Sequence, residues 1–150
     1  MSDKKVLLGL LGERIVAKVL RDSGYSVEES LNVFDPTKDM LVNGKKVEIK
    51  CQVPYLIHDA FAVSPNQLKK LLSCRYVFWV SVPPKQIHDL KGGWVYAMDT
   101  SVDVKYQTAR NRNGQEVIYF PRTQDAMKVI YKIKDISLLN HLKELSSSYM

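Results

Sequence analysis

The chain has 150 residues, with 22 Lys and Arg against 16 Asp and Glu, so its formal net charge is +6. Its composition of 45% hydrophobic and 25% charged residues is typical of a globular protein and argues against disorder, collagen or a coiled coil. A chain of this length predicts a single domain whose core needs no disulfide or structural metal.

The beginning of the chain, MSDKKVLLGLLGE, combines basic and apolar residues. Its apolar run ends at Leu11 and no cleavage site of small residues follows, so we expect a helix and not a signal peptide. No segment reaches the about 18 apolar residues that cross a bilayer. With Cys51 and Cys74 expected as reduced thiols, we predict a cytoplasmic protein without membrane contact, in a cell or a phage-infected host.

The predicted elements alternate between helices and strands along the chain. Apolar residues at three- and four-residue spacing predict a helix over about 4–23, ended by Gly24. An extended segment is expected over 25–34, and Ser64 with Pro65 predicts a helix that ends near Leu72.

The second half of the chain predicts mainly strands. The continuous apolar run over 76–82 is typical of a strand covered on both faces. Further elements are expected as strands over 94–98, 102–108, 116–120 and 127–133, and as a closing helix over 135–145. The predicted fold class is therefore α/β, a single domain with a mixed central β-sheet flanked by helices.

A hairpin is the strongest local signal. Asn43-Gly44 supplies the positive φ angles that a two-residue turn needs, so strands are predicted over 39–42 and 45–52. The register then places Asp39 opposite Glu48, with Cβ atoms about 4.5–5.5 Å apart. Two facing carboxylates repel each other, and a divalent cation such as Mg²⁺ would offset that repulsion because it takes carboxylate oxygens as ligands.

The second strand of the hairpin predicts one polar and one apolar face. Because side chains alternate along a strand, Lys50 and Gln52 share the face of Glu48, whereas Val47, Ile49 and Cys51 point into apolar packing. Two acids, a metal and a lysine suit phosphodiester hydrolysis. The plain alternative is a strand face exposed to solvent, with an aspartate that serves only in the turn. The predicted register of the hairpin favours a site over this alternative.

These residues resemble the PD-(D/E)XK nuclease superfamily, which covers type II restriction endonucleases, Holliday-junction resolvases and many phage and repair nucleases. The resemblance spans about residues 12–82. Its second motif falls on Asp39, and its E-x-K motif falls on Glu48-Ile49-Lys50. Lys38 replaces the proline that precedes the first acid in the family, and Asp35 is a rival for the position of Asp39.

The resemblance implies a restriction endonuclease-like core over about 4–82, followed by a basic β-rich extension over about 94–133 and a helix over about 135–146. It implies that Mg²⁺, with Mn²⁺ as a substitute, binds Asp39, Glu48 and the backbone carbonyl of Ile49. The implied catalytic residues are Glu13, Asp39, Glu48, Lys50 and Gln52. An exposed helix glutamate and a structural glutamine are the plain alternatives for Glu13 and Gln52.

Most of the positive charge lies after this core. Residues 105–134 hold seven basic and two acidic residues, a local net charge of +5, and Asn111–Gly114 predicts a hairpin tip within them. We expect nucleic-acid phosphates to be contacted there and at the helix after Ser64, by Lys105, Arg110, Arg112, Arg122, Gln67, Lys69 and Lys70. Ordinary solvated loops explain the basic tip about equally well.

The sequence therefore predicts a Mg²⁺-dependent endonuclease that hydrolyses DNA phosphodiester bonds, with a structure- or junction-specific enzyme preferred. A small type II restriction-type enzyme and a nucleic-acid-binding protein of the same fold that cuts nothing are the alternatives, and exonuclease action and RNA cleavage stay open. Phosphate-loop and dinucleotide motifs are missing, so no nucleotide cofactor is expected. A homodimer is expected, because resolving a junction needs two active sites.

Overall fold

The computed structural model describes residues 3–29, 40–55, 59–83 and 93–146. Within these ranges the chain forms a six-stranded sheet, a three-stranded sheet and three α-helices, so the expected mixed α/β class is confirmed. The helices are α1 (Asp3–Asp22), α2 (Leu68–Ser73) and α3 (Ile136–Ser146), and a 3₁₀ turn, η1 (Pro65–Gln67), precedes α2. None of these helices combines the length and the apolar character needed to cross a bilayer.

The larger sheet has the strand order β1-β2-β3-β5-β6-β9. Its strands are β1 (Val27–Glu28), β2 (Met40–Val42), β3 (Lys45–Gln52), β5 (Tyr76–Ser81), β6 (Trp94–Asp99) and β9 (Met127–Lys132). β3 and β5 run parallel, and the other neighbouring pairs run antiparallel. A parallel pair needs a long crossover connection, and here the crossover carries α2.

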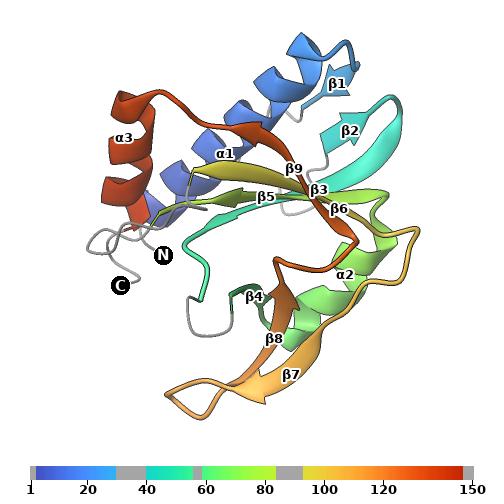
Figure 1. Ribbon diagram of the computed structural model, residues 1–150, viewed down its shortest axis with the longest axis vertical. Coiled ribbons are helices and arrows are strands. Elements are labelled where there is room, and N and C mark those ends of the chain that lie inside the picture. Colours follow the sequence, from blue (N-terminus) through green and yellow to red (C-terminus); the bar gives the residue numbers. More distant parts are fainter. Residues whose placement is uncertain (1–2, 30–39, 56–58, 84–92, 147–150) are drawn as a thin grey trace.

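The smaller sheet is antiparallel and has the order β4-β8-β7. Its strands are β4 (Ala60–Val63), β7 (Gln107–Arg110) and β8 (Glu116–Pro121). Figure 1 shows this sheet and α2 below the larger sheet, with α1 and α3 above and to the left. Neither β4 nor the division of the strands into two sheets is predicted from the sequence.

Both faces of the larger sheet are covered, and β5 shows this most clearly. Phe78 and Val80 pack with α1 and α3, whereas Val77 and Trp79 pack with α2 and the smaller sheet. The prediction of a strand buried on two faces is therefore confirmed. Trp79 stacks on Phe61 of β4 at 4.8 Å between ring centroids, which joins the two sheets.

α1 approaches β3 closely at Gly12. A Cβ atom at this position would lie 2.7 Å from the Cβ of Cys51, so the contact requires glycine. Burial raises the pKa of the Cys51 thiol to about 12, which makes it a poor nucleophile. Cys51 and Cys74 are both free thiols, as expected.

One predicted strand differs in extent from the structure. Of the expected range 102–108, only Gln107 and Thr108 lie in β7, so the prediction is wrong for residues 102–106. The side chain of Gln124 accounts for the difference at Lys105: its amide accepts from the backbone N–H of Lys105 and donates to its carbonyl. A side chain thus replaces the neighbouring strand that the backbone would otherwise need.

Candidate functional site

The predicted hairpin is formed by β2 and β3. Asn43 and Gly44 have φ angles of 50° and 78°, and Met40 pairs with Val47, so the turn and its register are confirmed. Asp39 would take the next register position, but it lies outside the described residues, as does its rival Asp35.

The two faces of β3 divide as the sequence predicts. Val47, Ile49 and Cys51 pack into the core beneath α1. Glu48 and Lys50 lie in register with Val77 and Trp79 of β5, whose side chains point toward α2 and the smaller sheet. Glu48 and Lys50 therefore belong to the face of β3 that is turned toward α2. Within the described part of the chain, the pairing of β2 with β3 joins residues 40–42 to residues 45–47.

The carboxylate of Glu48 is half-buried and lies beside a lysine of α2. Nζ of Lys70 is 3.3 Å from Oε2 of Glu48, and the two side chains are 49% and 20% exposed, respectively. The sequence predicts Lys70 as a phosphate contact and does not predict this ion pair. No local pattern could have shown it, because the two residues come from different elements, 22 positions apart.

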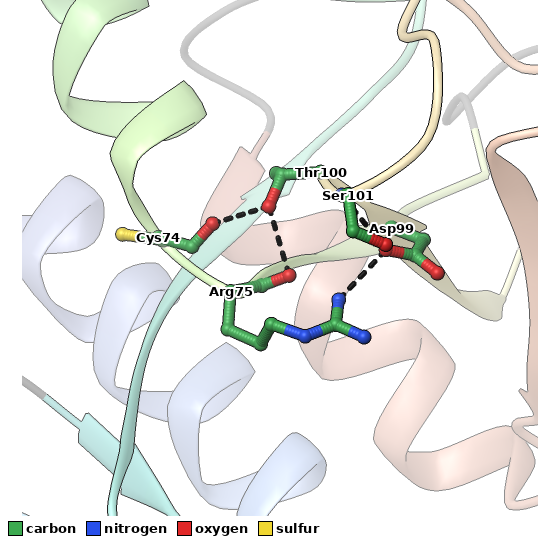
Figure 2. A network of polar contacts seen from close by, with 5 residues as sticks. All are labelled: Cys74, Arg75, Asp99, Thr100 and Ser101. Atoms are coloured by element: carbon green, nitrogen blue, oxygen red, sulfur yellow. Dashed lines mark hydrogen bonds and ion pairs between the residues drawn. The ribbon is translucent and has the colours of Figure 1, made fainter.

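The position of α2 is fixed at its end. Leu71 is completely buried, and a polar network ties the residues after α2 to the end of β6 (Figure 2). The hydroxyl of Thr100 points at the carbonyls of Cys74 and Arg75, and the Arg75 guanidinium donates to Asp99 at 2.7 Å. The helix that carries Lys70 is thus attached to the sheet by buried packing and by hydrogen bonds.

Lys50 is an ammonium group in a sheltered place. Burial lowers the pKa of Lys50, and the positive charges of Lys70 and Lys5 lower it further, while the Glu48 carboxylate raises it. Lysines with a lowered pKa are found at functional sites because a larger fraction of the amine is neutral at physiological pH. The residues around Lys50 therefore form a small charged cluster with contributions from α1, β3 and α2.

Gln52 has a structural role in this arrangement. Its amide nitrogen donates to the carbonyl of Ala62 at 2.9 Å, and its amide oxygen accepts from the N–H of Ala62 at 2.7 Å. Both groups of the side chain thus hold β4 beside β3. The geometry favours the structural alternative over the expected contact with substrate or water.

Glu13 and Ile49 stay predictions. Glu13 is half-buried on α1, directly after the glycine that contacts β3, and its side chain interacts within the protein. Ile49 packs its side chain toward α1, as its place in the strand requires. Its carbonyl stays the expected metal ligand.

Arg122 does not lie where a surface phosphate contact requires. Its side chain is 3% exposed, and its Nη2 lies 2.5 Å from Oδ1 of Asp59. The same guanidinium donates to Oδ1 of Asp59 through Nε and to the hydroxyl of Ser81 through Nη1. This prediction is therefore wrong: β8 ends in a buried ion pair, and Arg122 supports the fold.

The other expected phosphate contacts lie in two places. Arg110 and Arg112 are exposed at the tip between β7 and β8, where Arg110 donates to the carbonyl of Gly114 at 2.7 Å. Lys69, Lys70 and Lys105 are also exposed, and Gln67 is half-buried. The helix after Ser64 has only six residues and follows a 3₁₀ turn, so the expected binding at a helix N-terminus is not supported.

The described residues contain no group of three or more His, Cys, Asp or Glu side chains that would hold a metal ion. Of the predicted carboxylate pair, Glu48 lies within the described residues and Asp39 lies outside them. Comparisons with protein-family models, with curated proteins and with solved structures found no match to this chain.

Proposed function

We propose that the protein is a metal-dependent nuclease with a restriction endonuclease-like core, acting on DNA at the face of β3 that carries Glu48 and Lys50. The observation that carries the proposal is the half-buried Glu48 carboxylate between two ammonium groups. Lys70 is in contact with it, and Lys50 lies close enough to be affected by its charge. The E-x-K motif that resembles the PD-(D/E)XK superfamily falls on this place.

The described residues offer one carboxylate to a divalent metal ion, that of Glu48. The Glu48 carboxylate offers the hard oxygen ligands that Mg²⁺ and Mn²⁺ take, and the Lys70 ammonium stands where a positive charge is favourable. Asp39 and the Ile49 carbonyl would complete the ligands. When bound, the metal supplies a Lewis acid and lowers the pKa of water.

The residues of the chain itself would hold and orient the substrate. Lys50 is placed to balance negative charge on a phosphate, because its ammonium is sheltered from water and lies two residues from Glu48 on the same face. Arg110 and Arg112 would contact phosphates further along the backbone, since both are exposed. Junction-specific cleavage by a homodimer is the preferred form, and restriction-type cleavage is the alternative.

A nucleic-acid-binding protein without nuclease activity is the second candidate. The observation that favours it is the Lys70 ion pair, which neutralises Glu48 without any metal. The exposed arginines between β7 and β8 would serve such a protein equally well. The two candidates differ in what they do to DNA in the presence of a metal.

The deciding experiment incubates the protein with supercoiled plasmid, single-stranded DNA and a four-way junction, each in Mg²⁺, Mn²⁺ or EDTA. A nuclease cuts at least one substrate only when metal is present, and Glu48→Gln or Lys50→Met slows cutting by about 10²–10³-fold or more. Lys18→Gln is the matched control, because Lys18 makes an exposed ion pair with Asp22 on α1. Full cutting by either site variant refutes the nuclease proposal, and a mobility shift without cutting supports the second candidate.

A further inference from the structure

β9 is the last strand of the larger sheet, and it exposes three large apolar residues in a row. Among the described residues it pairs with β6 on one side only (Figure 1). Val129, Ile130 and Tyr131 are each 40–45% exposed. The other exposed large apolar residues of the described chain are not adjacent to one another in sequence, which is ordinary for a protein surface. A contiguous apolar run along an unpaired edge is instead typical of a place where another strand is added.

The other edges of the two sheets differ from β9. β1 has two residues, and its Glu28 is exposed. β4 receives both hydrogen-bonding groups of the Gln52 side chain. β7 exposes the polar residues Gln107, Thr108 and Arg110. Because short, covered or polar edges are the usual protection against unwanted pairing, β9 is the edge that is best suited to accept a strand.

The side chains of β9 are divided between the two faces of the sheet. Lys128 and Tyr131 pair with residues of β6 that pack toward α1 and α3. Val129 and Lys132 pair with residues of β6 that pack toward α2 and the smaller sheet. Ile130 is the extra residue of a bulge between these pairs. Each face of the edge therefore presents one lysine and one apolar side chain.

The charge of this edge is positive. Both lysines of β9 are exposed, and the strand contains no acidic residue. Exposed Lys134 follows the strand, and exposed Asp125 lies two residues before it. Asp135 accepts a hydrogen bond from the backbone N–H of Leu138 at the start of α3. An occupant of the edge therefore meets mainly lysine ammonium groups.

This charge favours an acidic strand over a second copy of β9. Antiparallel pairing of two copies about Ile130 would set Lys128 of one copy opposite Lys132 of the other, and like charges that face each other are destabilising. Lysines on an edge are a known protection against such self-pairing. A strand that carries carboxylates opposite the two lysines has the complementary charge and gains from both.

We propose that the outer edge of β9 binds an extended acidic segment of a partner protein, which adds to the larger sheet as a further strand. Main-chain hydrogen bonds along the edge supply affinity. Carboxylates opposite Lys128 and Lys132, with apolar side chains beside Val129 and Tyr131, supply specificity. The edge lies three strand positions away from β3, so the proposal is independent of the proposed nuclease function.

The first test measures binding of two labelled peptides to the full chain by fluorescence anisotropy. One contains Glu-Val-Thr-Val-Glu and the other Lys-Val-Thr-Val-Lys, so they differ only in charge. We expect the acidic peptide to bind at least about tenfold more tightly. Lys128→Glu combined with Lys132→Glu should reverse this preference. A protein that binds neither peptide, or both equally, overturns the proposal.

A matched control separates the edge from the net charge of the chain. Lys18→Glu combined with Lys45→Glu changes the net charge by the same amount at exposed positions of α1 and β3, and it should keep the preference for the acidic peptide. Reversal in the control as well overturns the assignment to β9. If the glutamate variant of β9 melts lower than the unmodified protein, Lys128→Gln combined with Lys132→Gln replaces it and should weaken binding of the acidic peptide without reversal.

The second test asks whether the peptide binds as a strand. Amide hydrogen exchange followed by NMR should slow in β9 when the acidic peptide is added, and it should stay unchanged in β7. Peptide binding without slower exchange in β9 would mean that the lysines attract the peptide by charge alone, which overturns the added strand.

Two other occupants would give different results. A second copy on this edge would appear in light scattering as a dimer that Ile130→Lys converts to a monomer. Single-stranded DNA on this edge would appear as DNA affinity that the Lys128 and Lys132 variants lose, in a protein that does not bind the acidic peptide. Either result overturns the acidic segment as the occupant of β9.

Discussion

Two groups of charged side chains lie on the same side of the larger sheet, and they are built in opposite ways. Around Arg122, the guanidinium makes three short contacts with Asp59 and Ser81 and is almost completely buried. Around Glu48, a single contact of 3.3 Å joins the carboxylate to a half-exposed lysine. The first group satisfies its charges internally. The second keeps a carboxylate and a sheltered ammonium within reach of an external ligand.

This difference separates residues that support the fold from residues that are available for function. A buried charge that loses its partner is costly, because the remaining charge stays desolvated. A half-exposed pair contributes little to stability, so it can exchange its partner at low cost. Substitutions in the two groups should therefore have opposite patterns of effect on stability and on binding.

The largest effect on stability is expected for Arg122→Met. It removes the Arg122 contacts of the Asp59 carboxylate, which is one-third exposed, so we expect a loss of about 2–4 kcal/mol in the free energy of unfolding. Denaturation by urea measures it. Arg112→Met, at an exposed position of the hairpin tip, is the matched control and should change stability by less than about 0.5 kcal/mol. Equal losses in the two variants would show that the Arg122 pair is unimportant.

A smaller loss is expected for Gln52→Leu. The change removes both hydrogen bonds to the Ala62 backbone and leaves that backbone unpaired on this side, which should cost about 1–3 kcal/mol. Gln107→Leu, at an exposed position of β7, is the control. If Gln52 is structural, the folded variant retains metal-dependent cutting. Loss of cutting with unchanged stability would return Gln52 to the catalytic residues.

The opposite sign is expected for Lys50→Met. Burial lowers the pKa of Lys50 in the folded protein, so the unfolded chain binds the proton more tightly and the folded ammonium costs stability at neutral pH. The Met variant should therefore melt a few degrees higher at pH 7. Its advantage should shrink as pH rises through the lowered pKa toward the unfolded value of about 10.4.

Thermal unfolding of Lys50→Met between pH 7 and alkaline pH measures this effect. Lys45→Met, at an exposed position of the same strand, should show no such pH-dependent gain. A Lys50→Met variant that is less stable at neutral pH would mean that the ammonium supports the fold. The contrast between the Arg122 group and the Glu48 group would then fail.

The sequence predicted the local part of this site and not its long-range part. The hairpin register followed from Asn43-Gly44, because both turn positions need positive φ, and the two faces of β3 followed from alternation. The pairing of β3 with β5, the contact of Lys70 with Glu48 and the burial of Arg122 join distant segments. They depend on how the whole chain packs, and periodicity within a window carries no information about that packing.

The missed and shortened strands have the same physical origin. β4 has alanines where a strand pattern favours branched or aromatic residues, and its pairing is supplied by β8 and by the Gln52 side chain. Residues before β7 have a strand-like composition, but the Gln124 amide takes the backbone groups of Lys105. In both cases a side chain from another segment decided the local structure.

The smallest effect is expected for Asp99→Asn in the network of Figure 2. Hydrogen bonds from Ser101, and then the Arg75 guanidinium, hold the pKa of Asp99 below its ordinary value. The unfolded chain therefore binds the proton more tightly, and the carboxylate contributes stability above the unfolded pKa of about 3.9 that is lost as pH falls through the lower folded pKa. At pH 7 the Asn variant should melt lower by less than about 4 °C, because the group is partly exposed.

Melting curves at neutral and strongly acidic pH measure this last difference. The gap between the Asp99→Asn variant and the unmodified protein should be present at pH 7 and should close in strong acid, where Asp99 is protonated in both states. A gap that stays constant would assign the effect to lost geometry instead of charge. Because this network anchors the end of α2, the variant also tests how firmly the helix that carries Lys70 is attached to the sheet.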